Sequence, residues 1–285
     1  NRCAAAMNGQ GIYPALARHH LVHVQARYLP GKLRIAVPCS LLVIEFVIVG
    51  PSGAVIESVD RWFKVAPPKR REKHWVDGKS AKELAKAWFR TGVAAPPTEL
   101  VALLDSSPFT RDAVVTRAIA ELETDLDGYR GEGRNHDVLL EARTKDGALI
   151  VVGIEAKVKE TLGQRLAARV RAKDAMKSAS QVRARIDSLV RALFARPRDG
   201  RAMGALRYQL LTAAAGTLIE ARQRGASGAL FVVHDLGATI RSKKRITPVQ
   251  RDMSEFVAAL AGESLQVEPG RIYGPINVAG NERIH

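Results

Sequence analysis

Cysteine is scarce in this sequence, and its scarcity excludes two kinds of small stabilised protein. Only Cys3 and Cys39 are present, and two cysteines cannot form a disulfide framework or a four-cysteine zinc site. Long apolar runs are also lacking. The longest, residues 35–49, contains Pro38 and Glu45 and is shorter than the roughly 20 apolar residues that span a bilayer. We therefore expect a soluble, cytoplasmic protein with no membrane partner.

Acidic residues are in deficit. Lysine and arginine outnumber them 44 to 29, which gives a formal net charge of +15 and a sequence pI of about 10.2. A protein this basic attracts polyanions, so nucleic acid is the first partner to consider. The sequence also lacks a glycine-rich loop of the nucleotide-hydrolase type and any evident serine or cysteine nucleophile constellation, which disfavours those two chemistries.

The first 59 residues differ from the remainder of the chain because they show no clear helical period. We interpret residues 1–59 as an N-terminal extension, peripheral or poorly ordered, and residues 60–285 as the main domain. Within the extension, the branched residues of 41–49 predict a strand, which a turn at 51–53 joins to 55–59.

The segment 60–76 is basic and carries three interleaved aromatic residues, Trp62, Phe63 and Trp75. Two interpretations stand. The rings pack on the core beneath a solvated segment, which we favour, or they belong to an arm that contacts phosphates and stacks on bases.

The remaining chain alternates between helical and strand periods, which predicts an α/β domain with a central mixed β-sheet flanked by helices. Ser80 and Glu83 fit a capping box at the start of the first helix. Helices are predicted at 80–91, 98–104, 110–122, 164–194, 207–224 and 248–261. Strands are predicted at 138–142, 148–155, 229–234 and 271–278.

The residues that carry chemistry lie on the first two of these strands. Asp137 begins one strand, and Glu155 and Lys157 end the next, joined to it by an Asp-Gly hairpin turn at 145–147. Side chains alternate along a strand, so Glu155 and Lys157 share a face, and the hairpin returns Asp137 beside them. Two carboxylates suit Mg²⁺ or Mn²⁺, and a nearby lysine stabilises charge in phosphoryl transfer.

This segment resembles the PD-(D/E)XK, or restriction-endonuclease-like, nuclease superfamily. Its members share a helix-strand-strand-strand-helix-strand core, with an acid on one strand and Glu-x-Lys on the next. Asp137 matches the first acid, and Glu155 and Lys157 match the Glu-x-Lys, although His136 stands where members often have proline. The resemblance covers roughly residues 80–278 and looks closest to uncharacterised bacterial members.

The resemblance implies a metal-dependent nuclease with catalytic Asp137, Glu155 and Lys157. It also implies an upstream metal-binding glutamate, for which Glu123 is the first choice and Glu121 the second, and a catalytic glutamine, Gln209, on a later helix. The expected substrate is DNA rather than RNA. Many members dimerise to cut two strands, so a homodimer is one expected assembly.

Basic residues near the motif are candidates for binding the nucleic-acid backbone: Arg165, Arg169, Lys173 and Arg207. Two alternatives remain open. The chain is a non-catalytic nucleic-acid-binding protein on a nuclease fold, or the acids form ordinary surface ion pairs and bind no metal.

Overall fold

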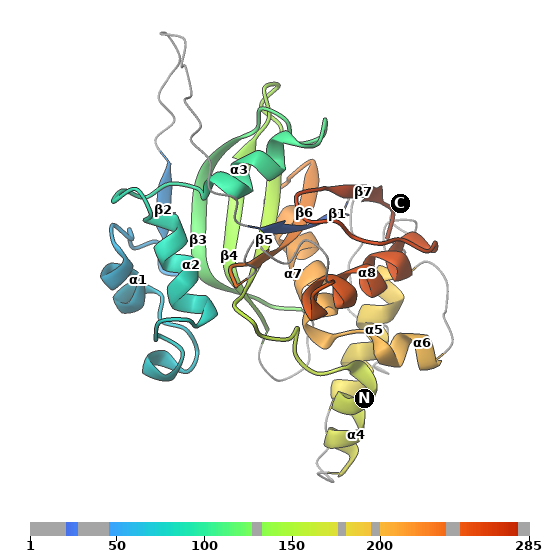
Figure 1. Cartoon of the computed structure of the whole chain (residues 1–285). Helices are drawn as coiled ribbons and strands as arrows, with labels where there is room; N and C mark the ends of the chain where they lie inside the picture. The colour runs from blue at the N-terminus through green and yellow to red at the C-terminus, as the bar shows by residue number, and fades with distance from the viewer. Residues whose placement is uncertain are drawn as a thin grey trace, which may run out of the picture.

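A mixed sheet of seven strands forms the centre of the computed structural model, which describes residues 21–27, 46–126, 133–175, 181–194, 200–237 and 246–278 (Figure 1). The strand order is β2-β3-β4-β5-β6-β1-β7. Pairing is antiparallel for β3–β4, β4–β5 and β1–β7, and parallel for β2–β3, β5–β6 and β1–β6. The strands are β1 (Leu21–Arg27), β2 (Val47–Val49), β3 (Val114–Thr124), β4 (Arg134–Arg143), β5 (Leu149–Lys157), β6 (Gly228–Asp235) and β7 (Tyr273–Ile276).

Helices cover both faces of the sheet, which confirms the predicted α/β class (Figure 1). The first layer comprises α1 (Val59–Val65), the short 3-10 helix η1 (Arg71–Lys73), α2 (Ser80–Trp88) and α3 (Thr98–Asp105). The second layer comprises α4 (Leu166–Ala175), α5 (Val182–Leu193), α6 (Gly200–Ala205), α7 (Tyr208–Gln223) and α8 (Pro248–Ala261). Each layer buries its apolar side chains in a core of its own against one face of the sheet.

Strand β5 is the most enclosed element of the predicted hairpin. Every residue from Ile150 to Lys157 is buried, because helices cover the strand on both sides. A nearly continuous apolar run is typical of such a doubly covered strand. The polar residues at its end, Glu155 and Lys157, are therefore held on a rigid frame.

The predicted helix at 110–122 is wrong, because these residues belong mainly to strand β3. The apolar positions of a central strand do not alternate cleanly, since both of its faces are covered. Here Ala118, Ile119 and Ala120 are all buried in succession, a run that also fits a helical stripe. The β-branched residues Val114 and Val115 favour a strand, and pairing with the neighbouring strands of the sheet stabilises that conformation.

Two further expectations on helices need correction. The stretch 164–194 contains two separate helices, α4 and α5, in the part that the structure describes. The capping box at Ser80 is absent, because α2 has Lys79 at its N-cap and Glu83 accepts the amide of Gly78 at 2.9 Å. The hydroxyl of Ser80 instead donates to Glu160 at 3.2 Å, a contact that ties α2 to the chain following β5.

Strands from the region that we interpreted as a peripheral extension join the sheet. β2 pairs with β3, and β1 lies between β6 and β7. The turn at 51–53 follows β2 as expected, with Gly53 donating to Gly50 at 2.9 Å. The sheet therefore crosses the boundary predicted at residue 59. Within the described residues, no helix has the length and apolar character needed to cross a membrane.

Close packing of α7 on β5 depends on Gly153. A Cβ atom at this position would lie 2.1 Å from Oγ1 of Thr217 on α7. We expect Gly153→Ala to lower the free energy of unfolding by about 1–3 kcal/mol, the range for overpacked cores. Urea denaturation of single and double variants measures this. Adding Thr217→Ala should recover part of the loss, and strictly additive losses would contradict the contact.

Candidate active site at the end of β4 and β5

Asp137, Glu155 and Lys157 gather where β4 and β5 separate. The ladder between the two strands ends at the pair Val138 and Ile154. Just beyond it, Oδ2 of Asp137 accepts the backbone amide of Ala156 at 2.7 Å. The side chain of Asp137 thus takes the place of a backbone carbonyl and is anchored on β5, next to Glu155.

Glu155 is the electrostatic centre of this cluster. Its side chain is buried, and Oε1 lies 2.5 Å from Nζ of Lys157 while Oε2 contacts the guanidinium of Arg134. Burial alone would raise the pKa of Glu155, but the charges of Arg134 and Lys157 outweigh it and hold the pKa at about 2. Glu155 is therefore a carboxylate at neutral pH.

Lys157 is a cation in this setting. Burial lowers its pKa, but the neighbouring carboxylates of Glu155 and Asp137 raise it by more, so the net shift is upward. An ammonium group with a raised pKa is a hydrogen-bond donor and a fixed positive charge at neutral pH, and it is not a general base.

Glu121 is the upstream acid that the structure brings to the cluster. It lies on β3 opposite Asp137, between the register pairs Ala120–Val138 and Leu122–His136. Its φ of +52° is an uncommon conformation for a residue with a side chain. Its Oε2 accepts a hydrogen bond from Asn135 at 2.5 Å.

Like charge at this end of the sheet is incompletely compensated. Burial, followed by the charge of Asp137, raises the pKa of Glu121 to about 8. Burial, followed by the charge of Glu155, raises the pKa of Asp137 to about 7. Both side chains are half-buried, so cations from solvent can reach them. Three carboxyl groups therefore lie close together at this end of the sheet, and the negative charge of each disfavours the ionisation of the others.

The first choice for the upstream metal ligand, Glu123, is not in this cluster. Its side chain is exposed, and its Oε1 accepts the amide of Gly133 at 3.0 Å. The register of β3 against β4 places Glu121 opposite Asp137, whereas Glu123 pairs with Asn135. The register between two strands leaves no mark in the spacing of acids along the sequence.

Sequence reasoning missed Arg134, one of the two cations that keep Glu155 ionised. The reason is a strand boundary: β4 begins at Arg134, whereas the apolar pattern predicts a strand only from residue 138. The four polar or charged residues at 134–137 read as loop. Their strand conformation depends on pairing with β3.

A second buried polar group lies behind the cluster. Nε2 of His136 is 3.1 Å from Oγ1 of Thr124, which donates to Glu220 of α7 at 2.5 Å. Burial and the charge of Arg134 lower the pKa of His136 well below its usual value, so the ring is neutral. A Cβ at Gly216 would lie 3.0 Å from this ring, which shows how closely α7 approaches β4.

Gln209 packs against the turn that follows the cluster. A Cβ at Gly163 would lie 3.1 Å from its amide carbon. Within the described part of the chain, its Oε1 atom is buried without a hydrogen-bond partner. The structure thus brings Gln209 to the chain that leaves Lys157, and no described contact joins it to the three motif residues.

The arginines expected to bind the nucleic-acid backbone have partners within the second helical layer. Arg207 lies 2.9 Å from Asp252 of α8 and donates to the carbonyl of Gly163 at 2.8 Å. The guanidinium of Arg169 sits 4.0 Å above the ring of Tyr208. Arg165 donates to the carbonyl of Ala205 at 3.0 Å. Lys173 lies on α4, and its side chain is outside the described residues.

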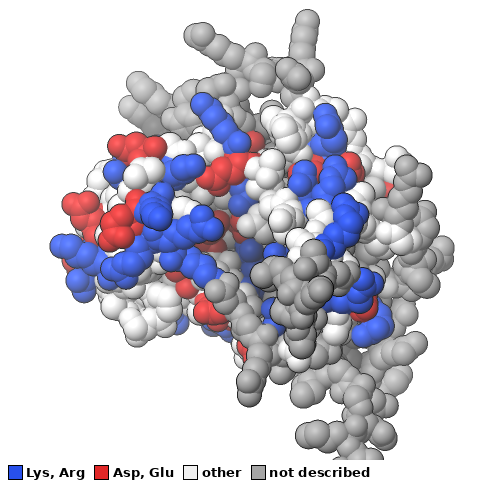
Figure 2. All heavy atoms as spheres, turned by 90° about the horizontal axis from the view of Figure 1, so that it is seen from below, with Lys and Arg blue, Asp and Glu red and all other residues white. Residues whose placement is uncertain are grey.

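The end of the sheet that carries the cluster faces the viewer in Figure 2, where the surface is recessed near the centre. Lysine and arginine side chains flank this recess, over the first helical layer on one side and the second on the other. In the described residues, no three His, Cys, Asp or Glu side chains are placed so that together they could hold a metal ion.

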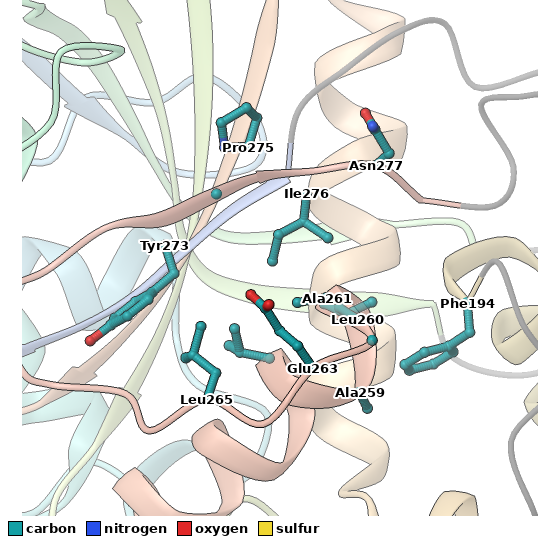
Figure 3. Close-up of a pocket in the computed structure, with 13 residues that line it drawn as sticks. Phe194, Ala259, Leu260, Ala261, Glu263, Leu265, Tyr273, Pro275, Ile276 and Asn277 are labelled. Carbon is teal, nitrogen blue, oxygen red and sulfur yellow. The ribbon is translucent and has the colours of Figure 1, made fainter.

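A separate cavity of about 810 Å³ lies between α8, β7 and the end of α5 (Figure 3). Its lining includes the apolar side chains of Phe194, Leu260 and Ile276, and Glu263 is the one carboxylate in it. None of the predicted site residues borders this cavity. Its lining offers no cluster of acids and bases for phosphodiester chemistry.

A comparison with known protein families assigns the chain to one of them. A family model described as "Domain of unknown function (DUF6946)" matches residues 55–282. The chain belongs to the DUF6946 family. The matched region contains the whole cluster, from Glu121 to Lys157, and it contains Gln209. No curated protein and no solved structure matches the chain.

The raised pKa of Glu121 predicts a pH-dependent cost to stability. The folded state holds this proton more tightly than the unfolded chain, so stability falls as pH rises from the unfolded pKa of about 4.5 through the folded pKa of about 8. Glu121→Gln should therefore raise the melting temperature at pH 8.5 by at least about 2 °C. At pH 5 the variant and the wild type should have the same melting temperature. An equal gain at both pH values would show that the ionisation of Glu121 is not the cause.

Proposed function

We propose that this chain is a metal-dependent nuclease that hydrolyses phosphodiester bonds, with DNA as the expected substrate. The observation that carries the proposal is the meeting of Asp137, Glu155 and Lys157 at one end of β4 and β5. These three residues match, position for position, the motif of the restriction-endonuclease-like nucleases that the sequence resembles.

The order of elements supports the same proposal. Helix α3 precedes the antiparallel strands β3, β4 and β5, and α7 precedes β6, which pairs parallel to β5. This helix-strand-strand-strand-helix-strand sequence agrees with the core of that superfamily. Helices α4 to α6 are additional elements between β5 and α7.

The donor set suits Mg²⁺ or Mn²⁺. These hard cations take carboxylate oxygens and complete their shells with water and substrate phosphate, so one or two protein carboxylates suffice. Asp137 and Glu155 would hold the ion, and Glu121 would lie close enough to interact with the charge of that ion. When bound, such an ion neutralises phosphate charge and lowers the pKa of bound water.

The chain's own residues prepare the site. Arg134 and Lys157 keep Glu155 ionised despite its burial. The amide of Ala156 orients Asp137. Lys157, as an ammonium donor, stabilises negative charge on the phosphate as the nucleophile adds. Burial of both motif side chains on β5 limits their motion, so their dipoles need little reorganisation.

A second candidate, a non-catalytic nucleic-acid-binding protein on the same fold, is favoured by one observation. Each carboxylate oxygen of Glu155 is already paired with a cation, Lys157 or Arg134. A metal ion must compete with these partners, whereas a purely structural ion triad needs no metal.

Cleavage assays on labelled single- and double-stranded DNA and RNA, with Mg²⁺ or Mn²⁺, separate the two candidates. We expect wild-type cleavage to require metal, and Asp137→Asn and Lys157→Met each to lower its rate by at least about 100-fold. Glu123→Gln removes an exposed carboxylate from β3 and should retain the wild-type rate.

Circular dichroism must first show that each variant melts cooperatively. Asp137 is only half-buried, so its isosteric variant is the one expected to fold best. Wild-type protein that binds nucleic acid but cleaves none of the four substrates with either metal would sink the nuclease proposal in favour of the binding protein.

A further inference from the structure

The chain between α1 and α2 lies beside the candidate site. Ser80, at the start of α2, donates to Glu160 at 3.2 Å, and Glu160 follows Lys157 by three residues. Residues 69–79, here called the η1 loop, therefore end next to the chain that leaves the site. In Figure 1 the chain between α1 and α2 lies toward the site end of the sheet, and in Figure 2 the first helical layer flanks the recess seen from that end.

The η1 loop has an excess of exposed positive charge. Its two acids are Glu72 and Asp77, and its basic residues, all exposed, are Lys69, Arg70, Arg71, Lys73 and Lys79. Asp77 is engaged by α2, with Lys82 at 3.0 Å and Lys86 at 2.7 Å. Its charge is thus compensated from outside the loop.

Three of these basic side chains have no acidic partner in the described part of the molecule. The structure shows no ion pair for Arg70, Lys73 or Lys79 among the described residues, and Arg71 makes only a 3.9 Å contact to its neighbour Glu72. The arginines across the recess differ, because Arg207 and Arg169 are bound within their own helical layer. Positive charge on the η1 loop is therefore available to a ligand.

The loop is also held in place. Trp62 of α1 is buried in the core, as the favoured interpretation of this segment expects. Beside it, the rings of Phe63 and Trp75 pack at 5.3 Å, and the guanidinium of Arg71 lies 5.9 Å from the Phe63 ring. A basic surface that is already ordered loses less conformational entropy on binding than a mobile arm does.

We propose that the η1 loop binds the phosphate backbone of the nucleic acid that enters the candidate site. Exposed, unpaired cations on a fixed loop suit phosphate oxygens, and phosphate contacts position a strand without reading its sequence. The proposal rests on the proposed function for the identity of the neighbouring site. The loop holds the flanking strand, while the carboxylate cluster faces the bond to be cut.

Fluorescence anisotropy in EDTA tests this without cleavage. The probes are labelled 30-nucleotide single-stranded DNA, the matching duplex, and RNA of the same sequence, across a range of NaCl concentrations. The variant Arg70→Ser/Lys73→Ser/Lys79→Ser changes only exposed side chains, so it should fold. Its matched control, Arg111→Ser/Arg143→Ser/Lys145→Ser, removes the same charge from exposed positions near the β4–β5 hairpin, at the opposite end of the sheet.

We expect the η1 loop variant to bind at least tenfold more weakly near 100 mM NaCl. On duplex, its slope of log K against log [NaCl] should be smaller by about 2–3, or roughly 0.9 for each phosphate that the protein no longer neutralises. The control should bind within about twofold of the wild type. Equal weakening in both variants would show a general charge effect and overturn the proposal.

Two other outcomes also decide. If the η1 loop variant binds nucleic acid as tightly as the wild type, the proposal is overturned. It is also overturned if the variant loses binding only to anionic lipid vesicles in a parallel sedimentation assay. If binding depends on the loop but the wild type cleaves nothing with Mg²⁺ or Mn²⁺, the interface stands and the nuclease proposal fails. Loop-dependent binding together with metal-dependent cleavage supports both.

Discussion

The site depends on a buried carboxylate that stays charged. Glu155 sits at the end of a strand covered on both faces, where an unpaired charge would cost several kcal/mol. Arg134 and Lys157 compensate that charge, one from each strand of the hairpin. The three groups meet because β4 begins as early as Arg134, because the hairpin has this register, and because β5 is buried on both faces.

The helix that covers this group is adapted to it. A Cβ at Gly216 would lie 2.8 Å from Cγ of Arg134, so a larger residue on α7 would displace the stem of the arginine. Gly153 serves the same approach from the side of β5, opposite Thr217. Close helix–sheet contact excludes water from the Glu155 ion pairs, which strengthens their attraction and raises the cost of breaking them.

Charge around the site is arranged in two zones. Glu121, Asp137 and Glu155 gather carboxyl groups at the strand ends, where burial first and the charge of a neighbouring carboxylate second raise the pKa values of Glu121 and Asp137. The η1 loop beside them is basic and exposed. An acidic centre attracts a cation and a basic rim attracts phosphate, so the two zones together suit a cation and a phosphate group.

The sequence by itself determined the α/β class, the strand that ends in Glu155 and Lys157, the hairpin before it and helix α8, because local periodicity and the Asp-Gly turn act over a few residues. Tertiary structure alone decided that 114–124 is a strand, that Glu121 replaces Glu123, and that Arg134 joins Glu155. Each of these depends on pairing between segments that are distant in the chain. A central strand covered on both faces loses its alternation, and the register between two strands decides which acid lies opposite Asp137.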